Sequence, residues 1–68
     1  MNVSQLVAKY GFGIRVSRQG ESFVVLSNNG CCFGKRKAQI VYRCRHDDGN
    51  EFDLCCRQFS DYEFVSIG

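Results

Sequence analysis

The sequence predicts a mainly β fold, with one short N-terminal helix over residues 2–10 and an antiparallel β-sheet over residues 13–67. Three observations predict it. Apolar residues first recur at helical spacing, their period then changes to two, and short turn sequences separate the alternating segments. A chain of 68 residues forms a single domain, 1–68, and buries only about 60% of its unfolded surface. We therefore expect a thin core.

The opening segment has the pattern of an amphipathic helix. Its apolar residues fall at i, i+3, i+4 and i+7, as Val3, Leu6, Val7 and Tyr10. Asn2 or Ser4 can cap the start, and Gly11 stands where a left-handed residue ends many helices. A helix of two turns is unstable alone in water, so the apolar stripe is expected to pack on the sheet.

The next segment contains two turn signals. Residues 18–21 separate two apolar runs and predict a first hairpin, whose register stays open. A two-residue loop pairs Val16 with Phe23, and a three-residue loop shifts this pairing by one. Residues 28–30, Asn-Asn-Gly, predict a second turn into a short strand at 31–33, because Asn-Gly accepts positive φ. Residues 34–37 are then expected to form a bulge or an exposed loop.

The central hairpin, residues 38–57, predicts its own register. A three-residue loop with glycine last, residues 47–49, is a standard connection between antiparallel strands. It places apolar pairs on one face: Cys44 with Phe52, Tyr42 with Leu54, and Ile40 with Cys56. It places opposite charges on the other face: Arg45 with Glu51, and Arg43 with Asp53. A two-residue loop would mix the two faces, so we expect the three-residue loop.

The order of the predicted elements resembles that of SH3-like barrels. Residues 58–62 suit one tight turn, and residues 63–67 then read as a last strand. SH3-like barrels also join their last two strands by a helical turn. The resemblance is one of topology and rests on no diagnostic motif; it implies a small meander or SH3-like barrel of about five strands.

Five cysteines are an odd number, and the first residues do not show the basic-then-apolar pattern expected of a signal peptide. We therefore expect reduced, mostly buried thiols in a cytoplasmic protein. A zinc site is disfavoured, since adjacent cysteines in a strand point to opposite faces and Cys44 and Cys56 would lie about 13 Å apart. No metal or cofactor is expected.

Catalytic and membrane functions are also disfavoured by the sequence. The single histidine, His46, lies next to Asp47 and two residues from Cys44, but a thiol facing the core is usually inert. No phosphate-binding or dinucleotide-binding glycine motif occurs. The longest apolar runs, 23–26 and 40–42, are far shorter than the roughly 18 residues of a membrane span. We expect neither an enzyme nor a membrane protein.

Charge is unevenly distributed along the chain and suggests a binding function. Residues 1–45 carry eight basic groups and one acidic group, a balance of +7, whereas residues 46–68 carry one basic and six acidic groups, a balance of −5. The predicted hairpin register neutralises Arg43 and Arg45. The basic residues that remain unpaired are Arg15, Arg18, Lys35, Arg36 and Lys37. Aromatic residues available for stacking lie near them in the chain: Tyr10, Phe12 and Phe33.

These patterns lead to two hypotheses for a non-enzymatic binding protein. In the first, the basic residues engage an acidic partner, either nucleic acid or an acidic protein or nucleoprotein surface. In the second, the chain is a protein–protein inhibitor or adaptor of the phage or mobile-element type, acting through its sheet edge and charged surface. A homodimer through charge-complementary ends or edge strands is a further expectation. The simpler alternative is a solvated basic loop with the aromatic residues in the core.

Overall fold

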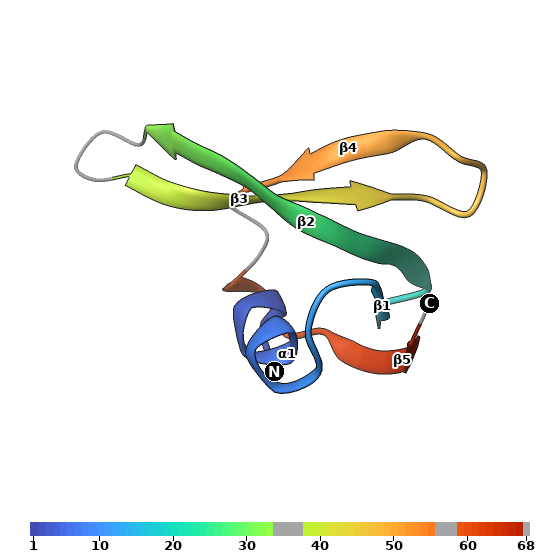
Figure 1. Ribbon diagram of the computed structural model, residues 1–68. Helices are drawn as coiled ribbons and strands as arrows, with labels where there is room; N and C mark the ends of the chain where they lie inside the picture. The colour runs from blue at the N-terminus through green and yellow to red at the C-terminus, as the bar shows by residue number, and fades with distance from the viewer. Residues whose placement is uncertain (34–37, 56–58, 68) are drawn as a thin grey trace.

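The computed structural model describes residues 1–33, 38–55 and 59–67, with side chains throughout these ranges except at 31–33 and 38–40. The predicted class is confirmed: a short helix is followed by one antiparallel sheet (Figure 1). The elements are α1 (Val3–Tyr10), β1 (Ile14–Arg18), β2 (Glu21–Phe33), β3 (Ala38–Arg45), β4 (Glu51–Leu54) and β5 (Glu63–Ile67).

Helix α1 begins with a capping box. The Asn2 side chain accepts a hydrogen bond from the Gln5 amide at 2.8 Å, and the Gln5 side chain accepts one from the Asn2 amide at 2.9 Å. Of the two predicted caps, Asn2 is therefore the one used. The helix ends at Gly11, whose φ of 86° suits glycine and whose amide donates to the Val7 carbonyl.

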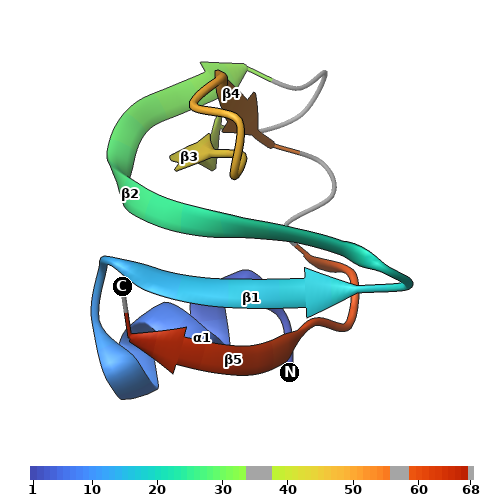
Figure 2. The same cartoon turned by 90° about the vertical axis from the view of Figure 1, so that its right-hand side faces the viewer.

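The five strands form one strongly bent sheet in the order β4-β3-β2-β1-β5. Figure 2 shows how β2 curls so that β3 and β4 lie over one end of it and β1 and β5 over the other. Helix α1 lies beside β1 and β5 (Figures 1 and 2), and the hydroxyl of its Ser4 lies 3.2 Å from that of Tyr42 on β3. The two edges of the sheet are therefore β4 and β5.

The predicted turn at Asn-Asn-Gly, residues 28–30, is wrong. The chain stays within β2 there, and the reversal falls between Phe33 and Ala38, which pair with each other. Residues 28 and 31 pair with residues 42 and 40, so β2 carries one extra residue, and Gly30 has a φ of 88°. Positive φ at glycine is required by a bulge as much as by a turn, so the local sequence did not distinguish them. A second extra residue lies between Val25 and Ser27.

The first hairpin has the two-residue loop. Val16 pairs with Phe23, and the loop residues Gln19 and Gly20 both have positive φ, 51° and 83°. These values are those of a type I′ turn, whose twist matches that of the flanking strands. The register left open by the sequence is thus decided in favour of the shorter loop.

The predicted register of the β3–β4 hairpin is confirmed where the structure describes it. The four pairs are Arg45 with Glu51, Cys44 with Phe52, Arg43 with Asp53, and Tyr42 with Leu54. The His46 amide donates to the Asn50 carbonyl, and Gly49 has a φ of 93°, so the loop has the expected three residues. The fifth predicted pair, Ile40 with Cys56, lies outside the described residues.

The core packs around Phe23, which is fully buried. Its ring meets those of Phe52 and Tyr62 edge-on, with centroids 5.2 and 5.5 Å apart. Val3 and Leu6 bring α1 into the same cluster, as the helical stripe predicts. The Tyr62 hydroxyl is buried, and no hydrogen-bond partner for it exists among the described residues.

Two cysteines are described with their side chains, and they differ. Cys44 is a reduced thiol with no exposed surface, and its sulfur lies 3.8 Å from the Tyr42 carbonyl oxygen. Cys55 is disulfide-bonded, so the expectation of reduced thiols is wrong there. The strand pattern identified the buried thiol, whereas pairing of sulfurs requires the tertiary structure.

No helix within the described ranges is long and apolar enough to cross a membrane.

Removing the Tyr62 hydroxyl should not destabilise the protein. We expect Tyr62→Phe to raise the free energy of unfolding by about 1 kcal/mol, because an unpaired hydroxyl is costly to bury. Tyr42→Phe is the matched control, since the Tyr42 hydroxyl lies 3.2 Å from that of Ser4, and its removal should cost about 1 kcal/mol. Urea unfolding of both variants checks this. A loss of stability in Tyr62→Phe similar to that in Tyr42→Phe would contradict it.

Alkylation without reductant should label fewer than five cysteines. The disulfide at Cys55 removes two thiols and leaves at most three of the five. Cys44 should react only after denaturant is added, because its sulfur is buried. Mass spectrometry of the alkylated chain counts the labels, and five labels under native, non-reducing conditions would exclude the disulfide.

Candidate binding surfaces

The predicted basic site is divided by the structure. Arg15 points to the outer face of β1 and forms an ion pair with Asp47, whereas Arg18, exposed at the end of the strand, is near Asp61. Residues 35–37 lie outside the described residues. Arg15 and Arg18 are three residues apart on β1, so their side chains lie on opposite faces of the strand and do not form one surface.

A different basic row crosses the outer face of the sheet. Arg15 pairs with Val24 across β1 and β2, and Val24 pairs with Arg45 across β2 and β3. The two arginines are thus separated by one strand, about 10 Å at the usual strand spacing. With Asp47 and Glu51 they line an open groove of about 420 Å³. We call this the arginine groove.

Arg45 belongs to this groove because Arg43 takes both neighbouring carboxylates. Arg43 donates to Glu51 at 2.9 Å and to Asp53 at 3.2 Å, and these hydrogen bonds raise the pKa of its guanidinium. Arg45 is exposed, and no ion pair to it is found in the described part of the chain. The register pairs Arg45 with Glu51, as expected, but the expected ion pair between these two residues is wrong, since Arg43 reaches Glu51 diagonally. The expected ion pair between Arg43 and Asp53 is confirmed.

The charged groups that line the arginine groove are of both signs. Arg15 and Arg45 line it together with the carboxylates of Asp47 and Glu51. Four of the nine lysines and arginines, Lys35, Arg36, Lys37 and Arg57, lie outside the described ranges.

The aromatic residues singled out for stacking have different surroundings. Tyr10 stacks on Phe64 with ring centroids 4.0 Å apart, so one of its faces is covered. Phe12 is 47% exposed and tilted against Tyr42 at 6.2 Å. The side chain of Phe33 is outside the described set. Of the two predicted stacking residues whose side chains are described, Phe12 therefore has the more open ring.

The two residues considered for catalysis, His46 and Cys44, have different surroundings. The His46 ring stacks on Phe52 at 4.4 Å and is half-buried. Cys44 lies in the core on the same side of β3. Within residues 1–33, 38–55 and 59–67, no three side chains of the metal-ligating types come together.

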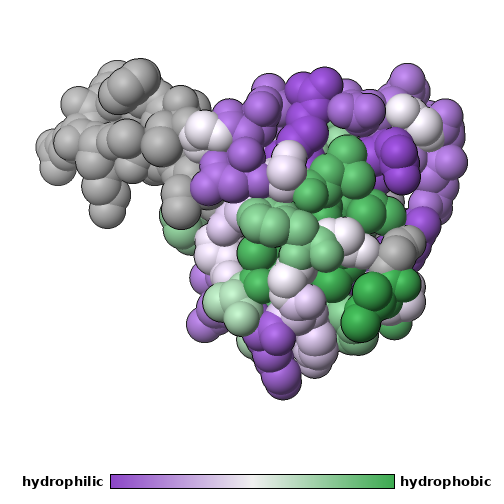
Figure 3. All heavy atoms as spheres, in the orientation of Figure 1, coloured by the Kyte–Doolittle hydropathy of each residue, from purple (hydrophilic) through white to green (hydrophobic). Residues whose placement is uncertain are grey.

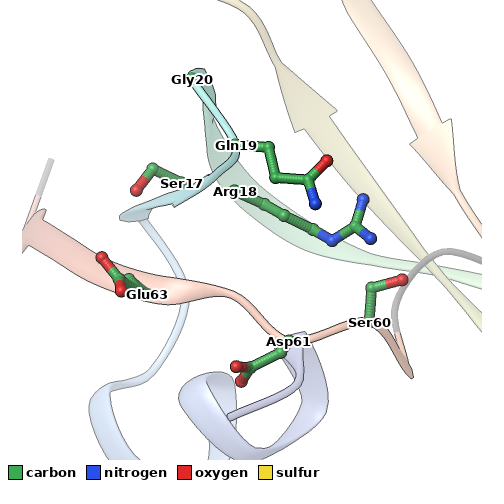
Figure 4. Close-up of a pocket in the computed structure, with 7 residues that line it drawn as sticks. All are labelled: Ser17, Arg18, Gln19, Gly20, Ser60, Asp61 and Glu63. Carbon is green, nitrogen blue, oxygen red and sulfur yellow. The ribbon is translucent and has the colours of Figure 1, made fainter.

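A second hollow lies where the first hairpin turn approaches the start of β5 (Figure 4). It measures about 480 Å³ and is lined by polar groups, among them Arg18, Gln19, Asp61 and Glu63. The pKa of Asp61 lies below its ordinary value, first because the N-terminal ammonium donates to its carboxylate and then because that charge and Arg18 are close. The Met1 carbonyl also accepts from the Tyr62 amide at 2.7 Å. The chain start is thus joined to the segment before β5.

Strand β5 is a candidate surface whose residues are not among the predicted site residues. Val65 is 49% exposed and Ile67 is 76% exposed. The run Glu63–Ile67 suggested a strand, and the apolar residues suggested burial, but nothing in the run indicated that this strand lies at the edge. Figure 3 shows apolar side chains gathered on the lower right of the molecule, where Figure 1 places β5.

No family model matches the chain, and no curated protein or solved structure is significantly similar to it.

Acid should weaken the attachment of the chain start to Asp61. The lowered pKa means that the ionised carboxylate stabilises the fold above the unfolded pKa, and that this contribution disappears as the pH falls through the folded value. We expect Asp61→Asn to be less stable than the parent at pH 6 and the difference to shrink below about pH 4. Glu63→Gln is the control, with a smaller effect at pH 6. Thermal unfolding against pH checks this; a constant difference down to pH 2 would refute it.

Proposed function

We propose that this protein is a non-enzymatic binding module whose basic residues engage an anionic partner, with nucleic acid as the first candidate. The arginine groove carries the proposal, because Arg15 and Arg45 lie in one row on an outer sheet face. Arg45 has no carboxylate partner among the described residues and is free to meet a phosphate. Guanidinium groups bind phosphate bidentately, which suits them to this role.

Asp47 and Glu51 line the groove beside the two arginines. A partner that binds there must displace the Asp47 carboxylate from Arg15. Asp47 holds Arg15 in an exposed ion pair, and such a pair contributes little to stability. A phosphate can therefore replace Asp47 at small cost. Because the groove holds two arginines beside two carboxylates, binding through the groove alone should be weak. Lys35, Arg36 and Lys37 remain part of the proposal as the additional phosphate contacts.

The second candidate is a protein–protein inhibitor or adaptor, of the kind carried by phages and mobile elements. The specific observation in its favour is the exposed apolar edge strand β5. A small domain with an exposed edge strand has the backbone groups needed for pairing with another chain. A cytoplasmic location is part of both proposals; the disulfide at Cys55 weighs against it, because the cytosol keeps most thiols reduced.

Binding to DNA should weaken steeply with salt. If three to five phosphates are neutralised, the logarithm of the association constant should fall with the logarithm of salt concentration with a slope of about −3 to −5. Fluorescence anisotropy with a labelled 16-base-pair duplex between 50 and 300 mM salt measures the slope. No binding at 50 mM salt, or a slope near zero, would exclude nucleic acid as the partner.

The arginine groove and residues 35–37 should contribute separately to that slope. Arg45→Gln should reduce its magnitude by about 0.9, the value for one phosphate contact. Lys9→Gln removes the same charge from the exposed side of α1, where Lys9 lies over the Tyr10 ring, and should leave the slope unchanged. The triple change of Lys35, Arg36 and Lys37 to Glu should abolish binding. Equal effects of Arg45→Gln and Lys9→Gln would show that only net charge matters and would remove the groove from the proposal.

A further inference from the structure

Strand β5 has one side paired and one side open. Its inner side pairs with β1, and it stands last in the strand order β4-β3-β2-β1-β5. No other described strand pairs with its outer side, and neither ribbon view places an element along that side (Figures 1 and 2). An edge of this kind presents unpaired amide and carbonyl groups that an extended segment can meet.

The side chains of β5 are apolar in its second half. Arg15 pairs with Ser66 and Val16 pairs with Phe64, so Val65 is an extra residue, a bulge, on β5. Val65 and Ile67 are exposed, although exposed edge strands in soluble proteins usually carry lysine or proline instead. The chain contains no proline, and β5 contains no lysine. Within Glu63–Ile67, the bulge at Val65 and the charge of Glu63 are the features that protect this edge, and Val65 and Ile67 stay exposed.

The first half of the same strand is acidic. Glu63 is exposed, and it has no ion-pair partner within the ranges that the structure describes. Asp61 lies two residues before it and is occupied by the N-terminal ammonium. Figure 4 shows both carboxylates beside the start of the strand. Along β5, an unpartnered negative charge is therefore followed by exposed aliphatic groups.

A second copy of the chain fits this edge poorly. If two β5 strands paired antiparallel about Val65, Glu63 of each would face Ile67 of the other, because both positions are two residues from the centre. If β5 instead paired with β4 of another copy, Glu63 would meet a strand of four residues that carries two carboxylates, Glu51 and Asp53. Like charges and charge–aliphatic pairs both disfavour strand pairing. The occupant is better matched by a different sequence.

We propose that β5 binds an extended segment of another protein by strand addition, with a lysine or arginine opposite Glu63 and aliphatic residues opposite Val65 and Ile67. This proposal rests on the second candidate function, a protein–protein inhibitor or adaptor, and describes the chemistry of its partner. It is independent of the arginine groove. Backbone pairing holds the segment, and charge complementarity at Glu63 selects its sequence and register.

Peptides provide the test. The probes are seven-residue acetylated and amidated peptides that alternate valine and threonine, with two lysines at either the N- or the C-terminus, so that parallel and antiparallel addition are both sampled. Matched peptides carry two glutamates in place of the lysines. We expect one lysine peptide to bind at least about fivefold more tightly than its glutamate counterpart and to protect the amides of residues 63–67 from hydrogen exchange.

A charge reversal makes the test specific. Glu63→Lys should invert the preference, so that the glutamate peptide becomes the tighter ligand. Ala8→Lys, on the exposed side of α1, adds positive charge elsewhere and should keep the preference of the parent. The double variant Val65→Lys, Ile67→Lys should lose binding of both peptides while its amide spectrum shows an intact fold. Retained preference in Glu63→Lys, or protection confined to β4, would overturn the proposal.

Two further outcomes identify other occupants and would also overturn it. Dimerisation of the chain alone in sedimentation, abolished by Val65→Lys, would show that a second copy occupies the edge. Protection of residues 63–67 by a DNA duplex would show that nucleic acid does. Loss of DNA binding in the salt titration leaves this proposal intact, because that measurement concerns Arg15, Arg45 and residues 35–37. Failure of strand addition likewise leaves the groove intact.

Discussion

The bent strand β2 is the constraint on which the rest of the structure depends. Its first residues, Glu21–Val25, pair with β1, and residues 24–33 pair with β3, so one strand belongs to both halves of the sheet. Two extra residues in β2, one of them next to Gly30, allow this bend because bulges increase local twist. The bend encloses Phe23 and places β4 and β5 at the two ends of the sheet. A straight strand would leave a flat sheet with no enclosed core.

The same bend decides which charges meet. Arg15 on β1 and Asp47 beyond β3 are 32 residues apart in the chain and form an ion pair because β2 brings their strands together. Arg43 spans two carboxylates on β4, which leaves Arg45 beside Arg15 on the outer face. The arginine groove is therefore a product of the packing of three strands. The groove does not depend on the excess of basic residues in the first 45 positions, which was the reason to expect a basic site.

The two candidate surfaces make different demands on a partner. The arginine groove is lined by charged and polar residues, and Val24 is the one aliphatic side chain among the described residues that line it. Such a surface suits a phosphate backbone that is bound through ion pairs. The β5 edge offers backbone groups, two aliphatic side chains and one carboxylate, which suits an extended polypeptide. Because the groove lies on the outer face of the sheet and the open edge lies beyond β1, one chain has room for both kinds of contact.

The sequence by itself determined the elements and the pairing that local chemistry dictates. The stripe from Val3 to Tyr10 specified α1, and the alternation around residues 47–49 specified the β3–β4 register, because a one-residue slip would have exchanged the two faces. Only the tertiary structure decided that residues 28–30 form a bulge, that Arg43 rather than Arg45 takes the carboxylates, and that Cys55 is disulfide-bonded. It also decided that β5, which reads like any other apolar strand, is an edge. These features depend on which segments become neighbours in space, and contacts between distant residues leave no mark in a local pattern.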